Sequence, residues 1–242
     1  IWKNQKMWVE NLSVDLPGSY QQHNLATALG ALDQLQRMGW AVETEHVLAG
    51  FQNVRKNTGL RGRWEVIHQE PLAIADVGHN EAGMLENKAV LEADPTTWHY
   101  VIGVVNDKDL AKMVEQLPIN ARFYASRPNI PRGLATEHLV DALNAAHRPV
   151  TAFNTVAEAY QAALAAAKKS NENVFVGGST FVVAEALPER PIIRDAGCGK
   201  WIQCPTNHLV SRSFLILINI VSTEVEYLTS FNSFVILKNT QQ

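Results

Sequence analysis

The chain has 242 residues, of which 46% are hydrophobic and 19% are charged, and its formal net charge is −3 at pH 7. This length suits one large domain or two small ones, and the composition is too apolar for an intrinsically disordered chain. The slightly negative charge and the lack of a Lys/Arg run exclude a basic face, so we expect no nucleic-acid partner.

The first 58 residues predict a mostly helical segment. Residues 3–17 alternate loosely between apolar and polar and end at a Pro-Gly turn signal. Residues 23–38 carry leucines at helical spacing, and residues 44–53 follow as a shorter helix with Thr44 as the expected N-cap. The polar, glycine-containing residues 55–63 predict a linker.

From residue 64 onward, apolar strand-like runs alternate with helical patterns. Strands are expected at residues 64–68, 72–75, 100–105, 122–125, 150–153 and 174–176. Helices are expected at about 80–93, 107–117, 136–146 and 155–169, with Asp107 and Thr155 as capping residues. This alternation is typical of βαβ units, so we expect an α/β fold: a Rossmann-like, mostly parallel sheet with helices on both faces. Ligands of such sheets bind at the carboxyl ends of the strands.

Three polar side chains directly follow the strand expected at 72–75. They are Asp76, His79 and Asn80, in the stretch IADVGHNEAGM. Free amides at the start of the next helix favour an anion, a carboxylate at Asp76 suits ribose hydroxyls, and His79 suits an anionic substrate or a proton transfer. Alternatively, Asn80 only caps the helix, Asp76 closes an Asx-turn and His79 is a solvated loop residue.

Five stretches of the chain form an ordered set of motifs. They are YQQHNLATALGAL (20–32), TGLRGRW (58–64), DVGHN (76–80), DKD (107–109) and FVGGSTFVVAEAL (175–187). Together they resemble the second half of the folylpolyglutamate synthase/dihydrofolate synthase family, in the Mur ligase superfamily. The resemblance implies a Mur ligase C-terminal α/β domain over residues 59–190, preceded by a remnant of the N-terminal ATP-binding domain over 1–58. A cell-wall Mur ligase fragment is the closest alternative, but Val77 stands where those enzymes typically have an aromatic residue.

The resemblance implies an ATP-dependent ligase that joins L-glutamate to dihydropteroate or folate through an amide. In this family the carboxylate is phosphorylated to an acyl phosphate, which the amine of glutamate attacks. The implied cofactors are ATP and Mg²⁺, and catalysis of this kind is mainly positioning and charge neutralisation. The implied partners are ATP, L-glutamate and dihydropteroate or folate, used by a monomer in folate biosynthesis. Because no apolar stretch reaches the ~18 residues of a membrane helix, we expect no membrane partner. The two cysteines both lie after residue 197, which fits a reducing cytoplasm.

Carried onto this sequence, the resemblance implies roles for individual residues. Asn24, Arg63 and Asp76 would contact ATP, with Arg63 at the phosphates and Asp76 at the ribose. His79 would act in catalysis and would lie, with Ser179, near the incoming glutamate. As alternatives, Asn24 and Ser179 could each cap a helix, and Arg63 could be an ordinary linker cation.

Four further residues bear on the site. Asp107 and Lys108 form a possible phosphate-binding loop, although Asp107 is also a good helix cap and Lys108 faces either phosphate or solvent. Arg132, in NIPRGL, is interpreted as a surface arginine. Phe181 stands where the family often has a tyrosine, so one hydroxyl beside the glutamate is missing.

The chain has no G-x-x-x-x-G-K-[ST] P-loop, and its first residue is Ile, not Met. In the family the P-loop, the magnesium ligands and most of the folate pocket lie in an N-terminal domain. We therefore expect that domain upstream, no metal ligands in this chain and no ligation by the chain alone. Residues 191–242 match nothing in the family and are interpreted as a non-native or read-through tail. A stand-alone, non-catalytic Rossmann-like module that binds a nucleotide or amino acid is the alternative from a different class.

Overall fold

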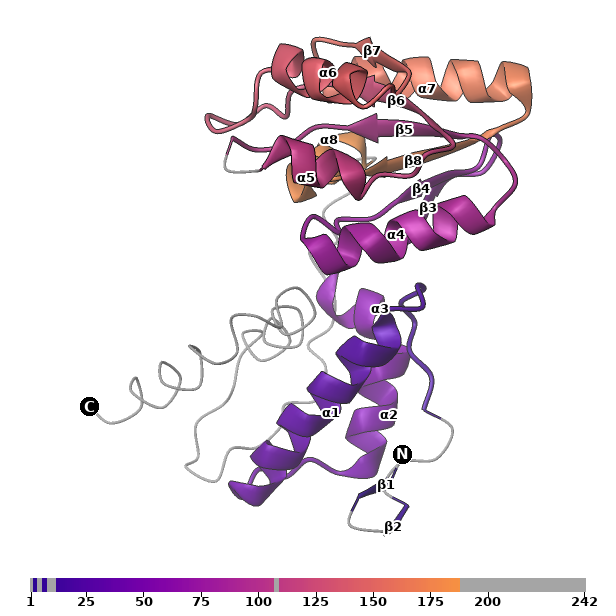
Figure 1. Cartoon of the computed structure of the whole chain (residues 1–242). Helices are drawn as coiled ribbons and strands as arrows, with labels where there is room; N and C mark the ends of the chain where they lie inside the picture. The colour runs from indigo at the N-terminus through magenta and orange to yellow at the C-terminus, as the bar shows by residue number, and fades with distance from the viewer. Residues whose placement is uncertain (1, 4–5, 8–11, 107–108, 188–242) are drawn as a thin grey trace. The chain divides into compact units, whose positions relative to one another are not determined.

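The computed structural model describes residues 2–3, 6–7, 12–106 and 109–187 (Figure 1). The described residues fall in two compact units, one ending at Leu60 and the other beginning at Arg61, and each has its own hydrophobic core. Within the described residues, no helix is both long and apolar enough to span a membrane. Asp107, Lys108 and the predicted tail at 191–242 lie outside the described residues.

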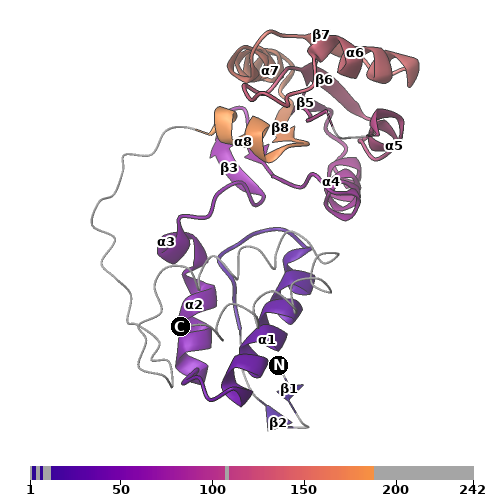
Figure 2. The same cartoon turned by 90° about the vertical axis from the view of Figure 1, so that its left-hand side faces the viewer.

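The first unit is helical, with a short antiparallel pair of strands near its start. Its elements are β1 (Trp2–Lys3), β2 (Lys6–Met7), α1 (Gln21–Arg37), α2 (Thr44–Gln52) and α3 (Val54–Thr58). The helices α1 and α2 lie side by side (Figure 2), and apolar side chains from both, among them Leu29, Leu32, Val47 and Phe51, form its core. The predicted helix pair is therefore present, since leucines at helical spacing give α1 one apolar face.

Two details of this unit differ from the prediction. The N-cap of α2 is Glu43, not Thr44, because the Glu43 and His46 side chains each bond the other's main chain in a capping box. The helix α3 occupies part of the expected linker. Val54 is buried in the unit's core and holds this short helix, which ends at Gly59 in the left-handed conformation (φ 71°).

The second unit is an α/β domain. Its strands are β3 (Glu65–His68), β4 (Ala73–Ala75), β5 (Trp98–Ile102), β6 (Ala121–Ala125), β7 (Val150–Ala152) and β8 (Asn173–Gly177). Its helices are α4 (Glu81–Ala93), α5 (Leu110–Glu115), α6 (Thr136–Ala145), α7 (Val156–Ser170) and α8 (Thr180–Ala186). The strands form one six-stranded sheet in the order β3-β4-β8-β5-β6-β7, in which only β3 is antiparallel to its neighbour. The predicted fold class is confirmed.

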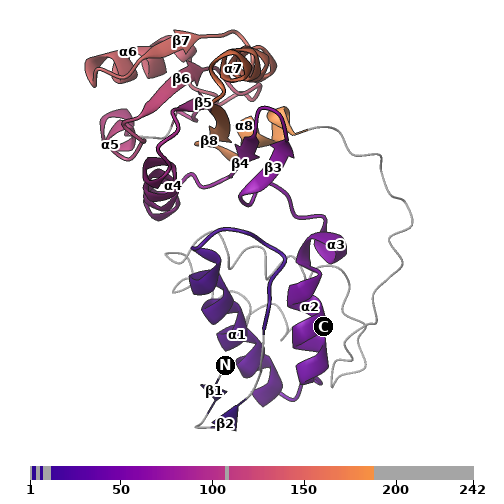
Figure 3. The same ribbon diagram turned by 90° about the vertical axis from the view of Figure 1, so that its right-hand side faces the viewer.

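Helices cover both faces of the sheet. Figure 3 shows α4, α5 and α6 on one side and α7 and α8 on the other. The strand side chains alternate accordingly: Tyr100 and Phe175 pack in the core under α4, α5 and α6, whereas Val101 and Val174 pack under α7 and α8. The predicted cap Thr155 is confirmed, and Asn80 caps α4, as the alternative for the loop after β4 had it. The helix α5 is shorter than predicted and is capped by Asp109 instead of Asp107.

The last strand in the sequence, β8, lies in the middle of the sheet. After β4, the connections through α4, α5 and α6 lead to β5, β6 and β7 along one face. The helix α7 then returns along the other face, and β8 inserts between β4 and β5. The helices α4 and α8, which follow the neighbouring strands β4 and β8, therefore lie on opposite faces of the sheet. In α/β proteins, ligands bind at the carboxyl ends of strands at such a point.

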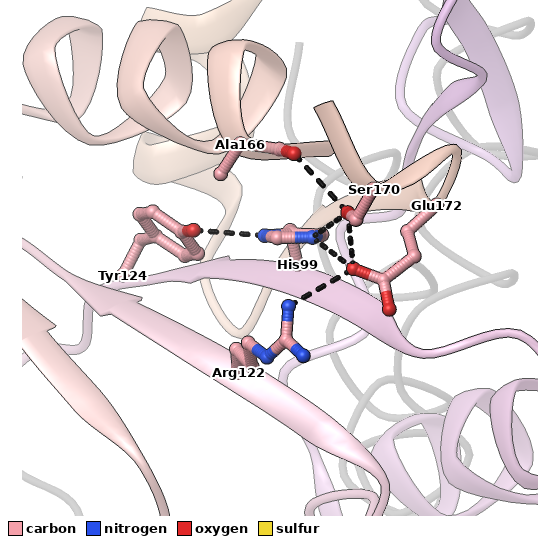
Figure 4. A network of polar contacts seen from close by, with 6 residues as sticks. All are labelled: His99, Arg122, Tyr124, Ala166, Ser170 and Glu172. Atoms are coloured by element: carbon pink, nitrogen blue, oxygen red, sulfur yellow. Dashed lines mark hydrogen bonds and ion pairs between the residues drawn. The ribbon is translucent and has the colours of Figure 1, made fainter. Parts of the chain in front are cut away.

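A polar network holds the opposite, amino-terminal edge of the sheet (Figure 4). His99, near the start of β5, is 1% exposed, with Nδ1 2.8 Å from the Tyr124 hydroxyl and Nε2 2.8 Å from Glu172 Oε2. Arg122 and Ser170 donate to the same carboxylate oxygen, at 3.0 and 2.5 Å. Both ring nitrogens are satisfied when Nε2–H donates to Glu172 and Nδ1 accepts from the tyrosine hydroxyl. The network ties β5, β6 and the end of α7 to the start of β8.

Candidate active site

The candidate site lies where β4 and β8 end side by side. The Asp76 amide donates to the Val176 carbonyl at 3.0 Å, so the loops after the two strands start together. The turn before β3 runs along the same edge, because the Val77 amide donates to the Gly62 carbonyl at 2.9 Å. The structure therefore places four of the predicted site residues at this one edge: Arg63, Asp76, His79 and Ser179.

Asp76 is buried, at 2% exposure, and its carboxylate is used inside the domain. Oδ1 accepts from the Gly78 amide at 2.7 Å and from Asn87 Nδ2 at 3.0 Å, and Oδ2 accepts from the Trp64 amide at 2.9 Å. Trp64 has a positive φ of 47°, a conformation rare for a bulky residue. Burial raises the pKa of the Tyr100 hydroxyl, and the negative charge of Asp76 raises that pKa further.

This position differs from the open, ligand-facing carboxylate that the sequence suggested. The physical reason is that two buried turns need an acceptor for their amides, and a buried N–H without a partner is costly. Asp76 closes the Asx-turn with Gly78 and also supports the turn at Trp64. The ribose contact expected of Asp76 stays a prediction. The hydrogen bonds of its carboxylate hold the turns at Trp64 and Gly78 in place.

His79 is half-buried in the loop after β4. Its Nδ1 lies 3.1 Å from the Val77 carbonyl, an acceptor, so Nδ1 carries the proton. Nε2 has no hydrogen-bond partner among the described residues. When the imidazole is neutral, this tautomer leaves a lone pair on Nε2 that can accept a hydrogen bond or a proton from an amine.

Arg63 is the strongest candidate for binding an anion. The residue is only 8% exposed, yet within the described ranges it has no hydrogen bond or ion pair. The neighbouring Arg61 contrasts with it, because Arg61 is paired with Glu65 through Nη2–Oε1 at 2.8 Å. An arginine without a carboxylate partner can bind an anion, and a phosphate would supply a negative charge in a geometry that suits the planar fork.

Ser179 is buried, at 4% exposure, and its Oγ accepts from the Phe181 amide at 3.2 Å as the N-cap of α8. The capping alternative therefore describes it, and the hydroxyl proton is still available to a ligand. Gly178 precedes it with φ 83°, which favours glycine at this turn.

The remaining candidates lie elsewhere or were interpreted differently. Asn24 belongs to the first unit, where it lies on α1 and its Nδ2 donates to Gln21 Oε1 at 3.1 Å. Arg132, interpreted as a surface arginine, is exposed but lies over the Phe181 ring. In the sequence, this contact is indicated only by the position of Arg132, a basic residue in the loop after the strand β6. Among the described residues, no group of three or more His, Cys, Asp or Glu side chains could hold a metal ion.

Residues 62–180 match the family described as Mur ligase, glutamate ligase domain. This part of the chain belongs to the Mur ligase family. The match covers β3 through the start of α8 and therefore the edge described above, apart from Arg61 and Phe181.

Full-length relatives share this segment. The chain is 33% identical over 181 residues to a probable bifunctional folylpolyglutamate synthase/dihydropteroate synthase of Haloferax volcanii, covering 73% of the chain and 21% of that protein. It is 31% identical over 182 residues to the dihydrofolate synthase/folylpolyglutamate synthase of Escherichia coli, covering 74% and 40%. The chain thus spans well under half the length of these relatives.

A solved structure of the same family has a similar fold. The bifunctional folylpolyglutamate synthase/dihydrofolate synthase of Yersinia pestis, complexed with AMPPNP and a Mn ion, is 26% identical with a TM-score of 0.54. The alignment covers 72% of this chain and 39% of that one. The resemblance found from the five motifs is therefore confirmed for the carboxy-terminal portion of that family.

Proposed function

We propose that the chain is the carboxy-terminal part of an ATP-dependent ligase that adds L-glutamate to dihydropteroate or folate. ATP transfers its terminal phosphoryl group to the carboxylate of the pteroate, giving ADP and an acyl phosphate. The amine of glutamate attacks the acyl carbon, the C–O bond to phosphate breaks, and the amine proton leaves to a base. The names and bound ligands of the relatives support this proposal, and the observation in this chain that carries it is Arg63, which is mostly buried and has no hydrogen bond or ion pair among the described residues.

Each polar residue at the carboxyl-end edge of the sheet has a separate role in this proposal. Arg63 would hold a phosphate, because its guanidinium is permanently charged and without a carboxylate partner among the described residues. His79 would accept a hydrogen bond from the amine of glutamate through Nε2 and orient it toward the acyl carbon. Ser179 would donate a hydrogen bond from its hydroxyl to the glutamate while its oxygen caps α8. Asp76 would hold the Trp64 and Gly78 turns in place.

The proposed reaction also requires Mg²⁺. Mg²⁺ requires oxygen ligands, and the described part of the chain has no cluster of three acidic or imidazole side chains. We therefore propose that the metal is held by residues outside the described part, and no step above is routed through it. The proposal also implies that Asn24 contacts the nucleotide from α1 and that the chain is inactive without a P-loop domain.

The test joins the chain at its amino-terminal end to the P-loop domain of a folylpolyglutamate synthase and measures ADP release. We expect release to require both L-glutamate and dihydropteroate or folate. Release that requires a UDP-sugar peptide instead would identify a cell-wall Mur ligase. Binding of nucleotide with no substrate-dependent release would favour a non-catalytic module. Val77, which stands where an aromatic residue is typical of the cell-wall enzymes, favours the folate branch.

A further inference from the structure

Asn87 is a buried amide in the second turn of α4, and its stability contribution alone does not explain it. The side chain is 2% exposed, and its Nδ2 donates to Asp76 Oδ1 at 3.0 Å. Because a carboxylate accepts hydrogen bonds and does not donate them, the amide nitrogen faces Asp76 and the amide oxygen faces away. That oxygen is buried and has no hydrogen-bond partner among the described residues. A buried acceptor without a donor costs free energy, so an apolar residue would suit this internal helix position better.

The oxygen that Asn87 contacts also holds the peptide group between Val77 and Gly78. Asp76 Oδ1 accepts from the Gly78 amide at 2.7 Å. The Val77 carbonyl, at the other end of the same peptide group, accepts from His79 Nδ1 at 3.1 Å. The N–H and C=O of a trans peptide point in opposite directions within one plane. A peptide held by its N–H at the carboxylate therefore keeps its carbonyl oxygen at the imidazole.

Glycine at position 78 leaves room for this arrangement. A Cβ atom at Gly78 would lie 2.8 Å from Asp76 Oδ1 and 2.9 Å from Asn87 Nδ2, closer than such atoms normally approach. Gly83, in the first turn of α4, allows the same close packing, because a Cβ there would lie 3.2 Å from Gly78 Cα. The loop after β4 therefore packs directly on α4, with the hydrogen-bonded pair of Asn87 and Asp76 beside it.

We propose that Asn87 is a positioning residue for His79. It acts through the Asp76 carboxylate and the peptide between Val77 and Gly78, and it keeps the imidazole proton on Nδ1. A hydrogen bond to a charged carboxylate polarises the peptide and makes its carbonyl a stronger acceptor. A stronger acceptor holds the proton on Nδ1, since the hydrogen bond at one ring nitrogen sets the tautomer. Nε2 then keeps the lone pair that would accept from the amine, a consequence that rests on the ligase function proposed above.

The test measures the tautomer of His79 by NMR in the full chain, with ¹⁵N-labelled histidine. The chemical shifts of the two ring nitrogens report which one carries the proton, and the His79→Gln variant assigns the signals by their loss. The pH is set about two units above the usual histidine pKa of about 6.5, so that the imidazoles are neutral. We expect the Nδ1–H form to dominate in the wild type. In Asn87→Leu the ratio of the Nδ1–H to the Nε2–H form should fall by about fivefold, as for loss of one hydrogen bond.

Two further variants separate this effect from a general loss of stability. Gly78→Ala keeps every polar side chain but pushes the ends of the Asp76 and Asn87 side chains apart, so the ratio should fall here too. It decides the question if Asn87→Leu does not fold, because Gly78 has no positive φ and its backbone accepts alanine. Leu91→Val removes a buried methylene one turn further along α4 and should keep the wild-type ratio.

The NMR result needs no ligase activity. A wild-type His79 with its proton mainly on Nε2, an unchanged ratio in the folded variants, or an equal change in Leu91→Val would overturn the inference. In the joined enzyme, Asn87→Leu should also lower kcat/KM for L-glutamate by about fivefold relative to Leu91→Val, from the same lost hydrogen bond. Normal glutamate kinetics in a variant with an altered ratio would overturn the link to catalysis. A wild-type enzyme without glutamate-dependent activity would instead contradict the proposed function.

Discussion

Asp76 shows how one carboxylate can organise a site from inside the domain. It accepts from the main chain before β3 and from the main chain after β4, so it joins the two segments that carry Arg63 and His79. A binding role and a structural role are difficult to separate by activity alone, since losing the carboxylate would disturb both neighbours. Stability measurements separate them, because the internal hydrogen bonds exist without any ligand.

Asp76→Ala should destabilise the second unit in the absence of ligand. Two buried amides, those of Trp64 and Gly78, would lose their acceptor, and unsatisfied buried donors cost about 1–3 kcal/mol each. We expect a loss of about 2 kcal/mol or more in the free energy of unfolding, measured by urea titration. Asp141→Ala, at an exposed position of α6, is the control. Equal stability of wild type and Asp76→Ala would show that the carboxylate does not organise this edge.

His79→Ala should impair the use of glutamate in the joined enzyme. Loss of the Nε2 acceptor removes the group that orients the amine, and general acid–base groups contribute roughly 100-fold or more. We expect kcat/KM for L-glutamate to fall by about 100-fold, with the KM for ATP within about twofold of wild type. His138→Ala, exposed on α6, serves as the control. A variant with normal glutamate kinetics would remove His79 from the mechanism.

At the scale of elements, the network in Figure 4 makes the stability of the sheet depend on pH. Burial acts to raise the pKa of Glu172, but hydrogen bonds from Ser170 and His99 and the charge of Arg122 outweigh it and hold that pKa below its usual value. A carboxyl group with a depressed folded-state pKa stabilises the fold fully above its unfolded pKa of about 4.3. This contribution is lost as the pH falls through the lower folded-state pKa.

Glu172→Gln should therefore be less stable than wild type at pH 7, with the difference shrinking as the pH falls below about 4. Urea unfolding at a series of pH values measures this difference. Glu137→Gln, at an exposed position of α6, should track the wild type throughout. A difference between Glu172→Gln and wild type that stays constant down to pH 3 would mean that the charge of Glu172 contributes nothing.

The period of apolar residues predicted the alternating strands and helices, because each face of the sheet requires a side chain at every second position. The strand order was not predictable in the same way. The sequence of residues 173–177 does not predict that β8 pairs with β4 and β5, because that placement depends on contacts between residues distant in sequence. Likewise, the pairing of His99 with Glu172, 73 positions apart, leaves no local signal.

The candidate site was predictable in its position but not in the direction its side chains face. Polar residues after a buried strand indicated the carboxyl edge, and the structure has Arg63, Asp76, His79 and Ser179 there. Sequence alone does not say whether a loop carboxylate faces ligand or supports a turn, and Asp76 supports two turns. The same limit hid the contact of Arg132, which depends on a ring 49 positions further along the chain.

At the scale of the whole molecule, the second unit should fold by itself. Among the described residues, both of its hydrophobic clusters, on the two faces of the sheet, are made from residues within 61–187. We expect residues 61–190, expressed alone, to unfold in one cooperative transition when monitored by circular dichroism, since single domains of this size usually do. A chain that shows no cooperative transition would mean that the unit needs further residues to complete its core.

The central claim is that this edge of the sheet serves the ATP-dependent addition of glutamate. Mass spectrometry of the joined enzyme's products tests it most directly, with dihydropteroate labelled with ¹⁸O in its carboxylate. The account predicts a product heavier by one glutamate residue and one ¹⁸O atom transferred to inorganic phosphate, as an acyl phosphate requires. Consumption of ATP without a glutamate-containing product, or phosphate free of ¹⁸O, would contradict it.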